Sequence, residues 1–294
     1  MIPSIFKDPV LQQQFDRDGY VKLSLLSVKD ITLLTDIFHS FHPTILNDQF
    51  VSSSFMDDPL IKIKIKEAIQ PIFQPHLDRI FQHYSYFGSA FLYKSMGKHT
   101  DVAPHQDWTI VDEKKYVAIN IWTPLIDTDN HNGTLCVVPG SHSSSLYTLR
   151  APTIPFFFQH YFNTVIRCAI PVNIKAGEAI ILNQSLIHYS APNLSGKIRP
   201  AITSGLKTSG APMLFHFMNK DKKVERYEMP GDFLLNFDNF PKEIYAAPTK
   251  GKLTEIIDYI PPALNRAEFM RRFSPTAVSM LDIMKEYLTN LFKR

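Results

Sequence analysis

The spacing of apolar and polar positions divides the chain into a helical beginning and a strand-rich middle. Residues 8–18 and Ser27–Phe41 have helical periodicity, and a short strand is predicted between them at Gly19–Leu23. The stretch that begins at Ile61 alternates like a strand, yet its isoleucines also fit a helical stripe. Because Asp58-Pro59 supplies a cap followed by a proline at the first helical position, we predict a helix there.

Between Tyr84 and Phe217 the pattern changes to short apolar or alternating runs separated by proline, glycine, asparagine and serine. Many short strands with turn signals between them favour a mainly β fold with flanking helices, built on a double-sheet jelly roll of which the cupins are one kind. The predicted strands are Phe87–Tyr93, Tyr116–Ile126, Leu135–Val138, Ile170–Ile174, Ala179–Leu182, Leu186–Ser190, Arg199–Leu206 and Leu214–Phe217.

The length of 294 residues suits one large domain, and we predict a single domain over residues 1–294. Its parts are a helical N-terminal part (about 1–83), a β core (about 84–217) and a C-terminal extension (about 218–294). The stretch from Ser274 to Lys293 has the pattern of an amphipathic helix, with Ser274 as its cap and a proline next.

Composition adds mild limits. Apolar residues at 45% and charged residues at 20% are typical of a soluble globular protein, and a net charge of +3 without a dense basic run argues against a nucleic-acid partner. No apolar run reaches membrane-spanning length, and the N-terminus has charges and a proline where a signal peptide needs an apolar stretch. Cys136 and Cys168 form no CxxC motif, so neither a disulfide framework nor a thiolate zinc site is expected. The expected location is the cytoplasm.

Three His-x-Asp motifs offer metal ligands, although about one such pair is expected by chance in a chain of this composition. His76-Leu77-Asp78 lies in a predicted helix, where residues two apart point to different faces. His99-Thr100-Asp101 lies in a turn region. His105-Gln106-Asp107 follows Pro104, which fits an extended entry, and residues two apart in a strand share a face. The third motif is therefore the best candidate of the three, although its spacing alone favours an exposed or core histidine beside a surface aspartate.

His188 can complete a set of two imidazoles and one carboxylate, which leaves other positions on a metal open for a co-substrate and oxygen. A turn at Asn193–Gly196 would pair Ser190 with Arg199 and place Ala201 opposite His188. One patch would then carry an imidazole, a hydroxyl and a guanidinium that can bind a carboxylate. The alternative is a surface hairpin whose arginine faces solvent. It is less favoured because the run 198–206 around Arg199 is otherwise uncharged.

Four segments carry a resemblance to a known family. They are PHQDW, IWTPL, NGTLCVVPGSH (Asn132 to His142) and LIHYSAPNLSGKIRPAI, in this order within Phe15 to Phe217. On these segments the chain resembles the phytanoyl-CoA dioxygenase family of iron(II)/2-oxoglutarate-dependent oxygenases. The resemblance implies a double-stranded β-helix core with iron(II) as the metal and 2-oxoglutarate as the co-substrate.

The resemblance also implies roles for individual residues. Iron would be held by His105, Asp107 and His188, and the distal carboxylate of 2-oxoglutarate by Arg199 with the hydroxyl of Ser190. Two further residues are assigned to the co-substrate pocket: Trp122, which matches an aromatic that lines it, and Asn120, which shares a strand face with Trp122. The Pro139–His142 turn is interpreted as architectural, and His142 is not expected to bind the metal.

The reaction implied is hydroxylation of a small organic substrate with oxygen, while 2-oxoglutarate becomes succinate and carbon dioxide. Related halogenases have a small residue at the position of Asp107, so hydroxylation is expected here. The alternatives are desaturation, epoxidation or cyclisation at the same site, a metal-dependent cupin enzyme that ignores 2-oxoglutarate, and a binding protein without turnover. The aromatic segment Phe156–Phe162 either lines the substrate pocket or packs in the core. The sequence indicates neither the substrate nor the oligomeric state.

Overall fold

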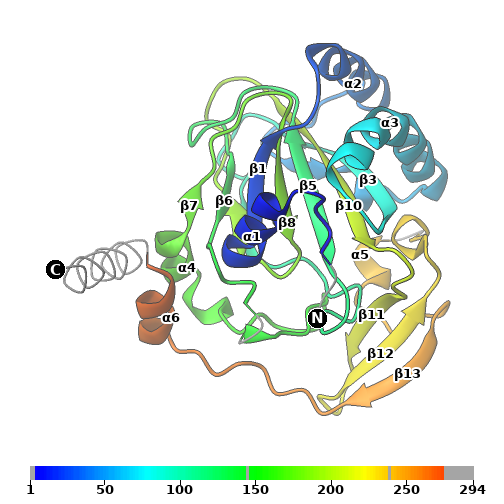
Figure 1. The fold of residues 1–294 in the computed structure, drawn as a ribbon, viewed down its shortest axis with the longest axis vertical. Helices are drawn as coiled ribbons and strands as arrows, with labels where there is room; N and C mark the ends of the chain where they lie inside the picture. Colours follow the sequence, from blue (N-terminus) through cyan, green and yellow to red (C-terminus); the bar gives the residue numbers. More distant parts are fainter. Residues whose placement is uncertain (1–3, 144–145, 238–239, 275–294) are drawn as a thin grey trace.

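The computed structural model describes residues 4–143, 146–237 and 240–274 of the chain (Figure 1). Its helices are α1 (Pro9–Asp18), α2 (Val28–Phe41), α3 (Pro59–Ile80), α4 (Phe162–Cys168), α5 (Phe240–Glu243) and α6 (Arg266–Phe273), with the 3-10 helices η1 (Ser53–Phe55), η3 (Gln159–Tyr161) and η4 (Phe233–Leu235). Its strands are β1 (Tyr20–Ser24), β2 (Phe50–Ser52), β3 (Tyr84–Lys94), β4 (Val102–His105), β5 (Ala118–Pro124), β6 (Leu135–Val137), β7 (Ile170–Pro171), β8 (Glu178–Asn183), β9 (His188–Ser190), β10 (Arg199–Thr208), β11 (Met213–Met218), β12 (Val224–Met229) and β13 (Lys252–Ile257).

Two antiparallel sheets form the core of the fold. The larger sheet has the strand order β1-β8-β5-β10-β3-β2, and the smaller has the order β4-β9-β6-β7. Apolar side chains from both sheets pack into one cluster between them, as in a double-stranded β-helix. The predicted fold class is therefore confirmed. A third sheet, β11-β12-β13, lies beyond the end of β10 at the lower right of Figure 1.

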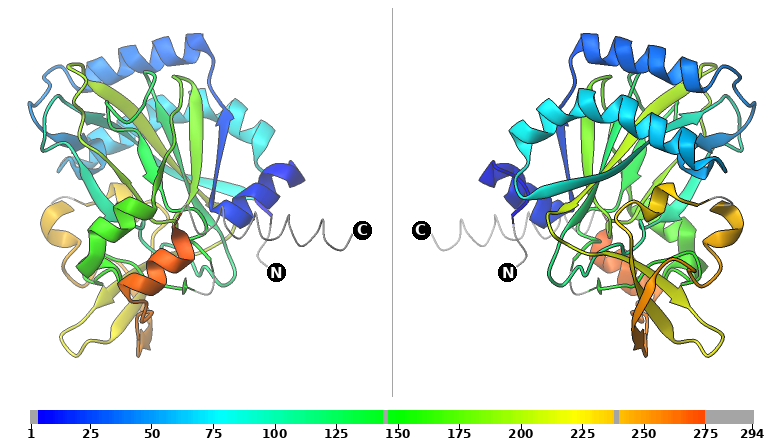
Figure 2. Two further views of the ribbon diagram at one scale, coloured as in Figure 1. Left: turned by 90° about the vertical axis from the view of Figure 1, so that its left-hand side faces the viewer. Right: turned by 90° about the vertical axis from the view of Figure 1, so that its right-hand side faces the viewer.

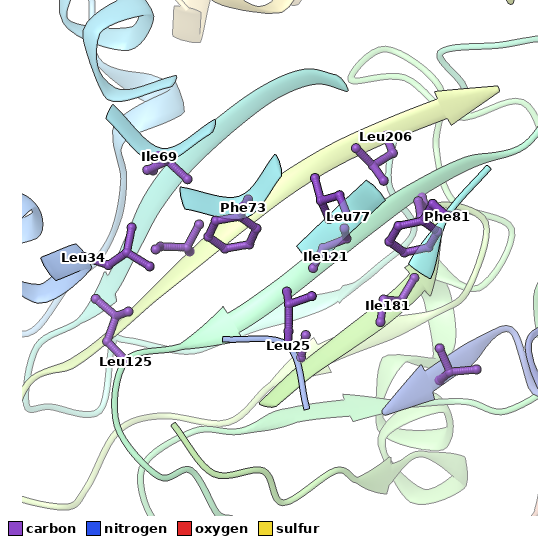
Figure 3. Close-up of a cluster of buried hydrophobic side chains, with 14 of the residues drawn as sticks. Leu25, Leu34, Ile69, Phe73, Leu77, Phe81, Ile121, Leu125, Ile181 and Leu206 are labelled. Atoms are coloured by element: carbon purple, nitrogen blue, oxygen red, sulfur yellow. The ribbon is translucent and has the colours of Figure 1, made fainter. Parts of the chain in front are cut away.

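Helices α2 and α3 cover the outer face of the larger sheet (Figures 1 and 2). Both begin where the sequence predicts, because Ser27 makes a capping box with Asp30 and Asp58 accepts a hydrogen bond from the backbone N–H of Leu60. Figure 3 shows their apolar stripes against the sheet. The labelled side chains in that view include Leu34, Ile69, Phe73 and Leu77 from the helices, and Ile121, Ile181 and Leu206 from the sheet.

Alternate residues on the inner face of the larger sheet pack against the smaller sheet. Trp122 and Ala201 lie in this inner cluster with Leu135 and Val137, whereas Ile119 and Ile121 lie in the outer cluster beneath the helices. The predicted division of β5 into two faces is confirmed. Trp122, a candidate for the co-substrate pocket, therefore lies between the two sheets.

The predicted hairpin that pairs Ser190 with Arg199 is wrong. Strand β9 pairs with β4 and β6, whereas β10 pairs with β3 and β5, so the chain crosses from one sheet to the other after β9. Arg199 lies opposite Lys94, and Ala201 lies opposite Leu92 on one side and Pro124 on the other. The turn residues are as expected, since Gly196 has a φ of 74°, but they join strands of different sheets.

A smaller apolar cluster joins α4 and α6 to the core on the left of Figure 1. Ser274 ends α6 as its C-cap, and the remainder of the helix predicted from Ser274 to Lys293 lies outside the described residues. Cys136 and Cys168 are buried free thiols, as the absence of a CxxC motif predicts. None of the helices in the described ranges is long and apolar enough to cross a membrane.

Candidate metal and co-substrate site

Three side chains that can bind a metal meet on the smaller sheet. His105 lies directly opposite His188 in the β4–β9 pair, and their ring centroids are 4.2 Å apart. Strand β4 ends at His105, so Asp107 lies beyond the strand. The prediction that His105 and Asp107 share one strand face is therefore wrong. The Nε2 atom of His105 is nevertheless 4.0 Å from Oδ1 of Asp107. One ligand atom from each of the three residues lies within 4.8 Å of the other two.

Backbone carbonyls fix which nitrogen of each histidine is available. Nδ1 of His105 donates to the carbonyl of Ala103 at 2.8 Å, and Nδ1 of His188 donates to that of Leu186 at 2.9 Å. Each Nε2 therefore keeps a lone pair that can bind a cation. Burial, together with the neighbouring His188, lowers the pKa of His105 to about 4. Neutral imidazole is the form that binds metals.

Asp107 is held through both its side chain and its backbone. Asn120 on β5 donates from Nδ2 to Oδ2 of Asp107 at 3.2 Å and accepts a hydrogen bond from the hydroxyl of Thr203. Nε of the buried Arg150 donates to the backbone carbonyl of Asp107 at 2.7 Å, and its guanidinium pairs with Glu113. Asn120, predicted in the co-substrate pocket, therefore lies against a metal-ligand candidate. Sequence reasoning missed Arg150 and Glu113, for which we find no sequence signal.

Arg199 on β10 is a buried cation without a complete set of partners. Only 1% of the residue is exposed, its guanidinium carbon lies 5.2 Å from the ring centroid of Trp122, and its Nε and Nη1 atoms have no hydrogen-bond partner. Burial lowers the pKa of Arg199 to about 9. An unpaired buried guanidinium is costly, so this pocket is suited to an anion.

Lys94 on β3 is a second buried basic residue beside Arg199, and sequence reasoning missed it. Its Nζ donates to the carbonyls of Ser190 at 3.0 Å and Ala191 at 2.5 Å. Burial and the charge of Arg199 lower the pKa of Lys94 to about 6. The signal used for Arg199, a cation within an uncharged run, is also present in the run 84–93 that precedes Lys94.

The other histidines named in the sequence analysis have structural partners elsewhere. His76 on α3 contacts Asp30 at 3.1 Å, His99 is a surface residue 2.5 Å from Asp48, and His142 donates to the carbonyl of Asp16 at 3.1 Å. Among the residues that the structure describes, His105, Asp107 and His188 form the one cluster of this kind.

Comparison with known proteins identifies the family. The family model for phytanoyl-CoA dioxygenase matches residues 29–201, which is more than half of the chain. The chain belongs to the phytanoyl-CoA dioxygenase family. This family is a class of 2-oxoglutarate-dependent dioxygenases, which use iron(II) as their metal and 2-oxoglutarate as their co-substrate.

The similar proteins cover only part of the chain. Phytanoyl-CoA dioxygenase 1 of Oryza sativa is 31% identical over 117 residues (39% of this chain, 42% of that protein), and phytanoyl-CoA dioxygenase of Arabidopsis thaliana is 30% identical over 144 residues (48% and 50%). The matched part thus spans about half the length of these relatives. Among solved structures, the carbocyclase SnoK from nogalamycin biosynthesis has a TM-score of 0.48 at 17% identity, and the match covers 68% of this chain and 84% of SnoK. EctD from S. alaskensis with 2-oxoglutarate and 5-hydroxyectoine has a TM-score of 0.48 at 18% identity, and the match covers 68% of this chain and 76% of EctD.

The residues on the two sheets fit the metal and co-substrate of the phytanoyl-CoA dioxygenase family. Two imidazole nitrogens and a carboxylate that leave one side open suit iron(II). The two unpartnered N–H donors of Arg199 suit a carboxylate. His105 and His188 lie on the smaller sheet and Arg199 lies on the larger sheet, with an apolar cluster between the two sheets.

A cavity of about 730 Å³ opens onto His105 and Asp107. Of the segment Phe156–Phe162, the side chains of Phe156, Gln159 and Phe162 line this cavity. Phe158 is fully buried and packs with Val138, Val165 and Ile187. The segment therefore lines this cavity at some positions and packs in the core at others.

Proposed function

We propose that this protein is an iron(II)/2-oxoglutarate-dependent oxygenase that hydroxylates a small organic molecule. The observation that carries the proposal is the position of Arg199 on the sheet that faces the metal-ligand candidates, buried and with two unpartnered donors. A metal enzyme that ignored 2-oxoglutarate would have no use for this costly group.

Each residue has a defined task in this proposal. Nε2 of His105, Nε2 of His188 and a carboxylate oxygen of Asp107 would hold the iron, and Arg199 would hold the distal carboxylate of 2-oxoglutarate. Trp122 packs against the guanidinium and, with its apolar neighbours, keeps water from this charge. When both are bound, the iron and 2-oxoglutarate supply the oxidising chemistry, by which oxygen is consumed, succinate and carbon dioxide are released and the substrate gains a hydroxyl group.

Two finer assignments belong to the same proposal. The hydroxyl of Ser190 would add a hydrogen bond to the carboxylate at Arg199. Lys94 links the two residues, because its Nζ contacts the Ser190 carbonyl and its pKa is lowered by the charge of Arg199. Asp107 occupies the position at which related halogenases have a small residue, which favours hydroxylation. A single oxygenase domain, a cytoplasmic location and the absence of a nucleic-acid partner remain predictions from the sequence.

The test is anaerobic addition of iron(II) and 2-oxoglutarate to the protein. We expect a visible charge-transfer band that is lost in His188→Ala and kept in His99→Ala, a matched change of a surface histidine. Arg199→Met should raise the 2-oxoglutarate concentration needed for the band without preventing iron binding. A band that is unchanged in His188→Ala would refute the metal assignment, and an unchanged 2-oxoglutarate requirement in Arg199→Met would refute the co-substrate assignment.

The mass of the product separates the remaining alternatives. A gain of one oxygen atom supports hydroxylation, or epoxidation if an alkene is consumed, whereas a loss of two hydrogen atoms indicates desaturation or ring closure. Product formation without succinate would refute the role of 2-oxoglutarate.

A further inference from the structure

The cavity above the metal-ligand candidates offers a substrate little charge. Among the described residues that line it, the acidic and basic side chains are Asp107, Lys62 and His105, and burial keeps His105 neutral. Asp107 belongs to the metal-ligand set, and Lys62 is 2% exposed with its Nζ donating to the carbonyl of Phe237 at 2.6 Å. The Lys62 ammonium is thus already held by the protein and Asp107 by its place in the ligand set, so the wall offers little to pair with a charged substrate, and an unpaired charge in such a site is strongly disfavoured.

Most polar groups of the cavity wall are also engaged within the protein. Thr203 donates to Asn120, which in turn donates to Asp107, and Ser89 bonds to the hydroxyls of Tyr86 and Ser204. These side chains satisfy each other, so they offer little to a substrate.

Gln184 is the exception. It follows β8 and is 6% exposed, and its side-chain Oε1 is buried without a hydrogen-bond partner. Because buried polar groups in proteins are nearly always paired, this acceptor indicates a donor that arrives with a ligand. Gln184 lines the same cavity as His105 and Asp107.

The remaining wall is apolar and comes from several parts of the chain. Phe87 lies on the core sheet, Phe156 on the loop that precedes η3, and Leu235 and Tyr245 belong to the extension beyond residue 201, where the family match ends. Phe55 is 50% exposed and Tyr245 is 61% exposed. Exposed aromatic side chains around a cavity are typical of a site for an apolar ligand.

We propose that the substrate is an uncharged, mainly apolar molecule that donates one hydrogen bond, from a hydroxyl or an N–H group, to Oε1 of Gln184. This inference rests on the proposed function, because it names the substrate class of that site. It favours neutral compounds over carboxylates, whose charge would enter the cavity, and over thioesters of coenzyme A, whose thioester group has no hydrogen-bond donor.

The test uses the anaerobic complex of the protein with iron(II) and 2-oxoglutarate and four probes that share one alkyl chain: decanol, its methyl ether, decanoate and decanoyl-coenzyme A. Binding is measured by calorimetry and by the fluorescence of Trp108, which lines the cavity. We expect decanol to bind about 5-fold more tightly than the ether, which lacks the donor. Decanoate should bind at least about 10-fold more weakly than decanol because its charge is buried, and the thioester about 5-fold more weakly because its thioester group lacks the donor. Equal or tighter binding of either anion, or no binding of decanol, would overturn the proposal.

Two matched variants test the role of Gln184. Gln184→Leu should bind decanol and the ether equally, while Gln159→Leu, which alters an exposed amide of the same cavity, should keep the preference for decanol. Thermal unfolding checks that both variants are folded. If Gln184→Leu is folded and still prefers decanol, Gln184 is not the acceptor. The charge-transfer band of the unaltered protein separates the two hypotheses. If the band is present but neutral probes are not preferred, the substrate class alone is refuted. If the band is absent, the proposed function is refuted.

Discussion

Replacing Glu113 with glutamine should destabilise the protein, because it leaves the buried guanidinium of Arg150 without its charged partner. The partner guanidinium of Arg150 is 1% exposed in its side chain, and its Nη1 donates to Oε2 of Glu113 at 2.9 Å. Removing one partner of a buried ion pair costs about 3–5 kcal/mol, because the other charge stays buried without compensation. Since Glu113 is 14% exposed and glutamine keeps one acceptor, we expect the low end, about 3 kcal/mol.

The assay is urea unfolding, with the free-energy difference taken from the shift of the midpoint at constant slope. The matched control is Asp112→Asn, which neutralises the adjacent carboxylate, whose pair with the exposed Lys115 contributes less than about 1 kcal/mol. Because Arg150 also binds the backbone of Asp107, Glu113→Gln should weaken iron(II) binding about 10-fold or more. Equal losses of stability in the two variants would refute the reasoning.

Further predictions concern Lys94 and the aromatic segment. The pKa of Lys94 falls from its ordinary 10.5 to about 6 on burial, so the unfolded chain binds one more proton than the folded protein between these values and the stability of the metal-free protein rises with pH. Lys94→Met should flatten this rise in urea unfolding measured from pH 6 to pH 9, and a parallel pH dependence in both proteins would exclude Lys94 as its source. Phe158→Ala should cost about 3–5 kcal/mol in unfolding free energy because the ring is fully buried. Phe156→Ala should cost less and instead raise KM for the substrate while the 2-oxoglutarate requirement stays constant; a larger loss of stability in Phe156→Ala would contradict this division.

The helices could be predicted because their signals are local. The Ser27 capping box and the Asp58-Pro59 start lie within a few residues of the helices that they begin. The helix α3 continues through Pro71 and Pro75, and its buried stripe, which includes Ile65 and Phe73, packs against the larger sheet. Packing of an apolar face contributes more to such a helix than local propensity does.

Strand pairing could not be predicted in the same way. The turn at Asn193–Gly196 is visible in the sequence, but the partners of the strands that flank it are distant. Arg199 pairs with Lys94, and His188 pairs with His105 and Val137. A turn signal describes four residues, whereas these pairings follow from the packing of two complete sheets. His105, Asp107 and His188 are brought together around the strand pairing of the smaller sheet, whereas Arg199 lies on the larger sheet and not in the predicted hairpin.

The buried polar residues illustrate the same limit. Arg150 and Gln184 look like ordinary surface residues in the sequence, since most arginines and glutamines are exposed. Only the fold shows that one is buried against Asp107 and the other lacks a partner in the cavity. Their importance comes from burial, which a single sequence does not report.

The candidate site is divided between two sheets, so the distance between its parts depends on how the sheets pack. The metal-ligand candidates His105 and His188 are placed by pairing within the smaller sheet, whereas Arg199 is placed by the larger sheet. The separation of these two groups is therefore set by the apolar cluster between the sheets, to which Trp122 and Val137 belong. Sheets that pack face to face shift when the side chains between them change in volume. For the proposed function, the fit of a dicarboxylate between the metal and the guanidinium would thus depend on the volume of these core side chains as well as on the residues that bind its two ends.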